Sequence, residues 1–443
     1  MNSETDKQLN YLRNPYVLLS VILLGGFILR LFLSMFLTYE PDFDVWRGWG
    51  RQIAIAGFGG FYDRYWCDYM PGYLYVLWLL DNIHRTFPAL SPEILFKLPA
   101  NLSDVGISAL IFFALRDITS VRNAMIAAAV YLFNPASLSN STFWGQVDSF
   151  HTLPILFSVF LGLRKHFVLS GLFAATAFMI KPQSIVIFPV IGFIAIKPVL
   201  DSLPKIGFRH YIPAVKFVMA IIFSLIIITL PFIWDDLDSL GYLITGPVDL
   251  IRERFETAYK QYEFTSLNAF NFWGSFAMWV NDEILFLGLS YKTWGTLIFG
   301  SIYALLMGLL LRSTLLRRHR EGKEFTYLIF ETIALVLFSL FLFVTRAHER
   351  HLLPAIVFFT LITFRTWIFW YMYAIVSCVY VINMIYSYIQ LTTKYSGVPE
   401  NVDLVMRAAM FSLYLSAFII VLIHFIIITV KYKNPVNSVI PRN

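Results

Sequence analysis

The segment PDFDVWRGW (41–49) combines carboxylates, a guanidinium and tryptophans directly after the first long apolar stretch. A carboxylate such as Asp42 or Asp44, placed at a membrane surface among aromatic side chains, has the chemistry of a general base. Arg47 and Trp49 follow on what the pattern indicates is an interfacial helix. Because Asp is also a favoured N-cap residue, the two carboxylates could instead serve only to begin that helix.

Two further segments carry polar groups at the edges of apolar stretches. YWCDYMPG (65–72) presents Asp68 and Tyr69 before a Pro-Gly turn, which could simply start the next helix. NPASLSNSTFWGQVDSFHTLP (134–154) presents Gln146 and Asp148 where an apolar stretch begins. Polar groups at such a depth are costly unless satisfied, so the segment predicts either a functional site or a structural hydrogen-bond cluster.

Basic residues occur at two other boundaries. Lys181 in MIKPQS (179–184) stands between two apolar runs, where it could bind a phosphate or extend its ammonium to the membrane surface. The segment TRAHERHLLP (345–354) departs from the HExxH zinc pattern, because its second histidine comes too early. We therefore predict an anion site, with no metal and no cofactor, formed from the five ionisable residues Arg346, His348, Glu349, Arg350 and His351.

A long segment, RERFETAYKQYEFTSLNAFNFWG (252–274), mixes aromatic residues with arginines and Asn268. Aromatic faces and amides suit a sugar ring, although the same composition is typical of an amphipathic interfacial helix. A later polar segment, 391–406, shows no such pattern.

The rest of the chain must hold these residues in a membrane. Hydrophobic residues make up 58% of its 443 residues and charged residues only 14%, against about 25% in soluble domains. Continuous apolar runs of about 20 residues exclude a soluble domain, a disordered chain and a β-barrel. We expect an all-α polytopic membrane protein. The net charge of +6 then reflects basic loops kept in the cytoplasm rather than a nucleic-acid partner.

Hydropathy predicts twelve spans, with 73–87 dipping into the membrane; a crossing there would give thirteen. Twelve spans place the basic clusters, including Lys7, Arg13, 311–323, Lys431 and Lys433, on the cytoplasmic side with both termini. The spans are 16–38, 95–115, 121–138, 149–163, 167–181, 183–197, 211–233, 284–311, 325–344, 350–367, 369–390 and 407–431.

The large external loops are then 39–94 and 234–283. We predict an N-terminal module of seven spans (1–233), the second external loop (234–283) and C-terminal transmembrane helices (284–443). The second loop exceeds the usual connection length, so it should be functional or contain helices of its own.

In this order the segments resemble the GT-C glycosyltransferases, and most of all the branch of the dolichyl-phosphate-glucose glucosyltransferases and their bacterial relatives. The first loop of that branch reads approximately GDFEAQRHW, followed by a DYPP turn. Here PDFDVWRGW (41–49) and DYMPG (68–72) stand in those places, with Trp46 for Gln and Met70 for Pro. The resemblance also covers HER (348–350), WGQVDS (144–149), KPQ (181–183) and SLNAFNFWG (266–274).

The resemblance implies a GT-C fold and a hexosyltransferase that takes glucose or mannose from a polyprenyl-phosphate carrier, with inversion. The acceptor would be a lipid-linked glycan or glycolipid on the external face, in a bacterial plasma membrane. Asp42 would be the base, helped by Asp44 and Asp148. The donor phosphate would meet Lys181, Arg346, His348 and Arg350. Sugar or acceptor would meet Arg47, Trp49, Asp68, Tyr69, Gln146, Asn268, Glu349 and His351. A carrier or flippase for a lipid-linked sugar and a protein O-glycosyltransferase are the alternatives.

Overall fold

The computed structural model describes residues 14–237, 239, 241–316 and 322–430, and most of them are helical. Within these residues, eight helices are long and apolar enough to cross a membrane. The chain is therefore an all-α, multi-pass integral membrane protein, as predicted. The eight are α2 (Pro15–Leu33), α6 (Pro92–Leu115), α11 with its leading turn η2 (Pro182–Asp201), α12 with its final turn (Ile212–Phe232), α14 (Tyr291–Leu316), α15 (Lys323–Phe343), α17 (Ile368–Thr392) and α18 (Glu400–Val430).

The other predicted spans correspond to shorter helices. These are α7 (Val121–Leu132), α9 (Asp148–Leu163), α10 (Phe167–Ile180) and α16 (Leu353–Ile362). Every predicted span thus contains a helix, because a helix satisfies its backbone hydrogen bonds internally. The number of crossings and their orientation stay predictions. Lys7, Arg13, Lys431, Lys433 and part of the basic block 311–323 (residues 317–321) lie outside the described residues.

Burial separates the centre of the bundle from its lipid-facing rim. α16 is buried along its whole length, and 89% of the apolar window of α15 is buried. On α2 only 17% of the window is buried. Exposed apolar side chains recur along α2 every three or four residues, at Leu18, Val21, Leu24, Ile28 and Phe32. Such a surface is stable only in contact with lipid or further protein.

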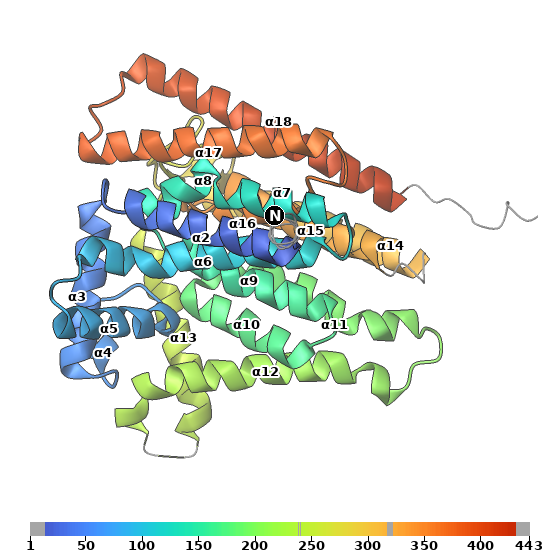
Figure 1. The fold of residues 1–443 in the computed structure, drawn as a ribbon, viewed down its shortest axis with the longest axis horizontal. Coiled ribbons are helices and arrows are strands. Elements are labelled where there is room, and N and C mark those ends of the chain that lie inside the picture. The colour runs from blue at the N-terminus through green and yellow to red at the C-terminus, as the bar shows by residue number, and fades with distance from the viewer. Residues whose placement is uncertain (1–13, 238, 240, 317–321, 431–443) are drawn as a thin grey trace, which may run out of the picture.

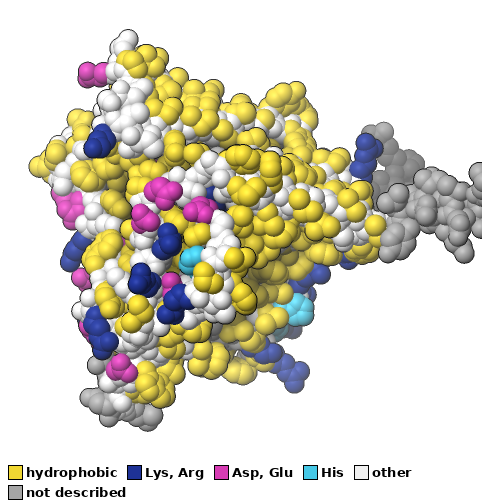
Figure 2. Space-filling view, turned by 60° about the vertical axis from the view of Figure 1, so that its left-hand side comes forward, with side chains coloured by type: hydrophobic (Ala, Val, Ile, Leu, Met, Phe, Trp, Pro, Cys, Tyr) yellow, Lys and Arg dark blue, Asp and Glu magenta, His cyan; other side chains and the backbone are white. Residues whose placement is uncertain are grey.

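Four helices cover one end of the bundle, at the left of Figure 1. They are α3 (Glu40–Ala56), α4 (Phe61–Arg64), α5 (Pro71–Thr86) and α13 (Tyr242–Gln261). The predicted interfacial and dipping helices thus exist as α3 and α5, and the second external loop contains a helix of its own. Figure 2 brings this end forward and shows basic, acidic and histidine side chains gathered there, bordered by hydrophobic ones.

Short strands join the second loop to the TRAHERH segment. β1 (Ser266–Leu267) pairs in parallel with β4 (Ala347–His348), and Asn268 forms a bridge with His348. These ladder hydrogen bonds place the SLNAFNFWG and HER motifs side by side.

The span predicted from 284 begins later than expected. β2 (Leu285–Phe286) and β3 (Leu289–Ser290) form a hairpin before α14 starts at Tyr291. Leu287 and Gly288 both have positive φ in the turn, which a helix cannot contain.

The predicted span 121–138 is interrupted. α7 ends at Leu132, and after α8 (Pro135–Ser137) the chain forms the π-helix η1 (Leu138–Trp144). Pro135 follows Asn134, whose backbone is extended, so the helix cannot run on. Gly145 then turns with φ of 87°, and its missing Cβ lets Lys97 approach. This break delivers the WGQVD segment to the covered end of the bundle.

Candidate functional site

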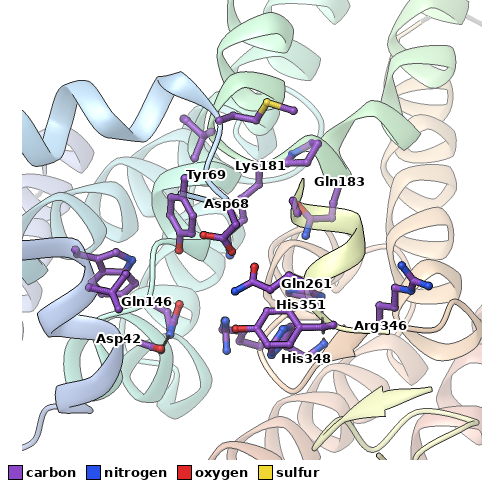
Figure 3. A pocket seen from close by; sticks show the side chains of 18 of the residues that line it. Asp42, Asp68, Tyr69, Gln146, Lys181, Gln183, Gln261, Arg346, His348 and His351 are labelled. Carbon is purple, nitrogen blue, oxygen red and sulfur yellow. Dashed lines mark hydrogen bonds between the residues drawn. The ribbon is translucent and has the colours of Figure 1, made fainter. Parts of the chain in front are cut away.

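A cavity of about 210 Å³ opens among α3, α13 and the loops before α5, α9, η2 and α16. Figure 3 shows Asp42 and Gln146 on one side of it and His348 and His351 on another. Ten of the predicted site residues line the cavity: Asp42, Trp49, Asp68, Tyr69, Gln146, Lys181, Arg346, His348, Arg350 and His351. The other five, Asp44, Arg47, Asp148, Asn268 and Glu349, are not among its lining residues.

The helical period of α3 decides which of its side chains face the cavity. Asp42, Val45, Trp46 and Trp49 line it, and their spacing of three and four residues puts them on one helix face. Asp44 and Arg47 are exposed, and the Arg47 guanidinium lies over the Phe43 ring.

Asp42 is held by two neutral N–H donors. Gln146 Nε2 donates to Asp42 Oδ2 at 2.5 Å, and Trp144 Nε1 donates to the same oxygen at 3.1 Å. Trp144 is the last residue of η1, and Gln146 lies in the turn between η1 and α9. The carboxylate is therefore oriented toward the cavity by hydrogen bonds from neutral groups, with no direct ion pair among the described residues.

Asp148 is held differently. Its Oδ1 forms an ion pair with Lys181 Nζ at 2.5 Å, and Asn140 Nδ2 donates to its Oδ2 at 3.2 Å. Asp148 is almost completely buried, at 1% exposure. Because an ammonium already neutralises it, Asp148 orients Lys181 rather than offering a free base.

Two arginines are fixed by acidic partners behind the cavity wall. Arg346 is bound in bidentate fashion by buried Asp282, at 2.7 Å from Nε to Oδ2 and 2.9 Å from Nη2 to Oδ1. Its guanidinium also stacks 4.0 Å from the centre of the Tyr259 ring. Arg350 Nη1 pairs with Glu349 Oε1 at 2.9 Å. Rigid arginines of this kind are suited to a fixed anion.

The two cavity histidines are neutral at physiological pH. Burial, together with the nearby cations Arg350 and Lys181, lowers the pKa of His348 well below its ordinary value and that of His351 to about 3. The backbone N–H of His348 donates to His351 Nδ1 at 3.3 Å. A neutral imidazole that accepts at Nδ1 carries its proton on Nε2, so His351 can donate a hydrogen bond there.

Asp68 is the second carboxylate of the cavity. Burial raises its pKa to about 6, while the charges of Arg350 and Asp42 act on it in opposite directions. Aromatic residues form the wall beside it: the Tyr69 ring lies 5.1 Å from Trp49, whose Nε1 donates to the Trp66 carbonyl. Carboxylate oxygens next to aromatic faces can accept hydrogen bonds from the hydroxyl groups of a sugar, while the rings pack on its C–H groups.

A second cavity of about 310 Å³ adjoins the first and is much more apolar. The two share six lining residues, Lys181, Pro182, Gln183, Ala258, Arg346 and His351. Beyond that border, its lining includes Asp148, His151 and Lys292, but most of its walls are apolar side chains. These come from η2, α15 with the residue after it, and the start of α16, namely Ile185, Val186, Leu337, Leu340, Phe341, Val344 and Pro354. One end is thus cationic and polar, and the other suits a hydrocarbon chain.

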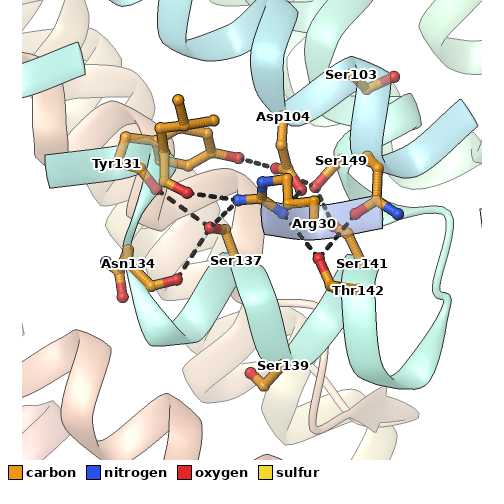
Figure 4. Close-up of polar contacts among 12 residues, drawn as sticks. Arg30, Ser103, Asp104, Tyr131, Asn134, Ser137, Ser139, Ser141, Thr142 and Ser149 are labelled. Carbon is orange, nitrogen blue, oxygen red and sulfur yellow. Dashed lines mark hydrogen bonds and ion pairs between the residues drawn. The ribbon is translucent and has the colours of Figure 1, made fainter. Parts of the chain in front are cut away.

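A buried polar network holds the turn that carries Gln146 (Figure 4). Arg30 of α2 forms an ion pair with Asp104 of α6 at 2.7 Å, and both side chains are completely buried. Arg30 also donates to Ser137 and Thr142 around η1, and Asp104 accepts from Tyr131 and Ser149. The network therefore ties α2 and α6 to both ends of the WGQVD turn.

Several lining or supporting residues were missed by reasoning from the sequence alone. Trp144 lies in the recognised WGQVDS segment, so its proximity to Asp42 could have been expected. Gln183 lies in KPQ, and Tyr262 in the 252–274 segment. Asp282 lies between Asn281 and Glu283 in a turn, and no local signal predicts its pairing with Arg346.

Among the described residues, no group of three or more His, Cys, Asp or Glu side chains is placed to hold a metal ion. Comparison with protein-family models gave no match, and comparison with curated proteins gave none either.

Proposed function

We propose that the protein is an inverting hexosyltransferase of the GT-C type, which transfers a sugar from a polyprenyl-phosphate carrier to a lipid-linked or glycan acceptor at the external face of a bacterial plasma membrane. The observation that supports this most strongly is the shared border of the two cavities. A polar cavity with two carboxylates meets an apolar cavity at a line of cationic and hydrogen-bonding groups.

A lipid-phosphate sugar matches this border part by part. The polyprenyl chain would occupy the apolar cavity, and the phosphate would meet Lys181, Arg346 and the Nε2 proton of His351. The hexose would extend into the polar cavity toward Asp68 and Tyr69. Each cation already has an acidic partner, so its position is fixed before the donor arrives, and no reorganisation is needed when charge develops.

In the transfer step, an acceptor hydroxyl oxygen attacks the anomeric carbon while the bond from that carbon to the phosphate oxygen breaks. The departing phosphomonoester keeps the bonding electrons, and the nearby cations stabilise its added charge. Asp42 receives the hydroxyl proton on Oδ1, since Gln146 and Trp144 both donate to Oδ2. Attack from the face opposite the leaving group inverts the configuration.

The test uses purified protein in proteoliposomes with radiolabelled polyprenyl-phosphate glucose or mannose and a membrane lipid extract. We expect the label to move from one of the donors to a new product, with inverted configuration. Consumption of neither donor, with labelled lipid crossing the bilayer intact, would contradict the transferase and indicate a carrier instead.

A further inference from the structure

A third cavity, of about 410 Å³, lies between the second loop and the helices α17 and α18. Its walls are Asn268, Met278, Trp279, Tyr386, Gln390, Tyr395, Val398, Glu400, Asp403 and Arg407. Its size falls within the range of about 300–1,000 Å³ that is typical of small-molecule sites. Tyr395 and Glu400 belong to the segment 391–406, in which the sequence showed no chemical pattern.

We propose that this cavity binds a neutral saccharide unit of the acceptor, beyond the sugar that reacts. That the bound saccharide belongs to the acceptor rests on the proposed transfer reaction. Saccharide binding at this cavity does not depend on that reaction.

Two aromatic rings form one wall. Trp279 and Tyr395 meet edge to face, with 5.6 Å between ring centres. Trp279 is half-buried, and its Nε1 donates to Asn268 Oδ1 at 2.9 Å. Tyr395 is 48% exposed, so much of its ring is open to a ligand. Rings of this kind can pack on the C–H face of a sugar while their polar atoms remain satisfied.

The residues of α17 and α18 in the lining offer fixed polar groups. Tyr386 donates to Asp403 at 2.6 Å, and Arg407 pairs with the same carboxylate at 2.8 Å. Gln390 is 5% exposed and donates to Tyr386, but its buried Oε1 has no partner within the described part of the chain. A buried amide oxygen without a donor is costly, and a sugar hydroxyl would supply one.

The charges of this cavity favour a neutral ligand over a phosphate. Its lining has one cation, Arg407, against two carboxylates, Asp403 and Glu400, whereas the polar cavity has three cations, Lys181, Arg346 and Arg350, against Asp42 and Asp68. Hydroxyl groups can donate to these carboxylates, whereas a phosphate would be repelled.

The third cavity is also linked to the polar cavity that contains Asp42. Asn268 lines it and forms the bridge to His348. On another side, the Tyr39 ring lies 5.0 Å from Trp144, which donates to Asp42. Tyr39 also lies edge to face with Tyr388, at 6.4 Å between ring centres, and so contacts α17, which forms part of the wall of the third cavity. An acceptor glycan bound at Trp279 could therefore reach toward Asp42.

The test compares Tyr395→Gly with Lys394→Gly. Both residues have positive φ, at 66° and 52°, and both are exposed, but only Tyr395 lines the cavity. Because glycine tolerates this conformation, neither change strains the loop. The probe is the pool of oligosaccharides released by mild acid from the glycolipids of the native membrane, titrated against the intact protein by tryptophan fluorescence.

We expect the pool to bind wild type and Lys394→Gly equally, and Tyr395→Gly at least tenfold more weakly. In the transfer assay, Tyr395→Gly should raise the acceptor KM about tenfold and leave the donor KM unchanged. Equal binding by both variants, or no binding to wild type, would overturn the proposal. Glycan binding without any sugar transfer would leave this site standing and refute the proposed reaction.

Discussion

The side-chain amide of Gln146 donates a 2.5 Å hydrogen bond to Oδ2 of Asp42, across 104 residues of sequence. The bond joins the first interfacial helix to the turn between η1 and α9, and Trp144 adds a second donor to the same oxygen. A carboxylate oriented in this way keeps its other oxygen directed into the cavity, and such positioning of a reacting group contributes substantially to a rate.

Loss of this orientation should lower turnover without weakening donor binding. We expect Gln146→Leu to reduce kcat about tenfold, which is less than the roughly 10²–10⁴ that a general base itself contributes, and Gln146→Leu with Trp144→Phe to reduce it further. Gln146→Glu should be more damaging than either, because two adjacent carboxylates cannot both stay ionised. Steady-state kinetics at varied donor concentration measures the effect. A raised donor KM with unchanged kcat would show that Gln146 binds the donor instead.

Asp148 and Lys181 should show separable structural and functional roles. Lys181→Met leaves the buried Asp148 without its counter-charge, so we expect a loss of about 3–5 kcal/mol in unfolding free energy. The double variant Lys181→Met, Asp148→Leu should recover much of that stability but not the affinity for the lipid-phosphate donor. Unfolding in mixed micelles and donor binding are measured on the same samples. Recovery of donor affinity in the double variant would contradict a phosphate contact by Lys181.

The rate should depend on pH through Asp68. Burial raises the pKa of Asp68 to about 6 in the folded protein, compared with about 3.9 for a free side chain. Ionising it therefore costs stability as the pH rises through 6, while a hydroxyl contact needs the ionised form. We expect kcat/KM to fall by about tenfold per pH unit below 6.

Asp68→Asn should remove this acidic limb and lower the plateau. Asp63→Asn is the matched control, since Asp63 is exposed on α4 and is not among the lining residues of the cavity. An unchanged acidic limb in Asp68→Asn would assign the titration to another group.

The buried network at Arg30 should be essential for folding and for the turn that holds Gln146. Arg30→Met leaves Asp104 buried beside only neutral donors, and we expect it to cost about 3–5 kcal/mol of unfolding free energy. Arg30→Met with Asp104→Leu should restore part of that stability but still lower kcat, because Ser149 and Thr142 each lose one of their hydrogen-bond partners. Arg164→Ala, at an exposed ion pair, should leave stability near that of wild type. Full activity in the double variant would exclude a positioning role.

Long apolar runs were sufficient to predict the helices, but which side chains meet in the cavity was harder to predict. The apolar runs predicted each of the eight helices that are long and apolar enough to cross a membrane, and the short run 73–87 predicted α5. The polar aromatic segment before it predicted α3, because both signals depend on local composition. The meeting of SLNAFNFWG with HER depends on the β1–β4 pairing, which no local pattern indicates. The site residues on α3 could have been sorted by helical period, since Asp42 and Asp44 cannot both face one cavity.

Arg30 and Asp104 illustrate a signal that was present in the sequence but not used. Both lie inside predicted spans, where an ionisable residue is costly without a partner. Their pairing could therefore have been anticipated. Their link to Ser149 and Thr142 could not, because it depends on the π-helical turn η1 and on the break at Pro135.

The most direct test of the proposed chemistry compares Asp42→Asn with Asp44→Asn. The two residues lie on the same helix two positions apart, but only Asp42 lines the cavity. Single-turnover transfer and donor binding are measured for both variants in lipid. We predict that Asp42→Asn lowers the transfer rate by about 10²–10⁴ with donor binding nearly intact, and that Asp44→Asn transfers at the wild-type rate. Near-normal transfer by Asp42→Asn would contradict its role as the base.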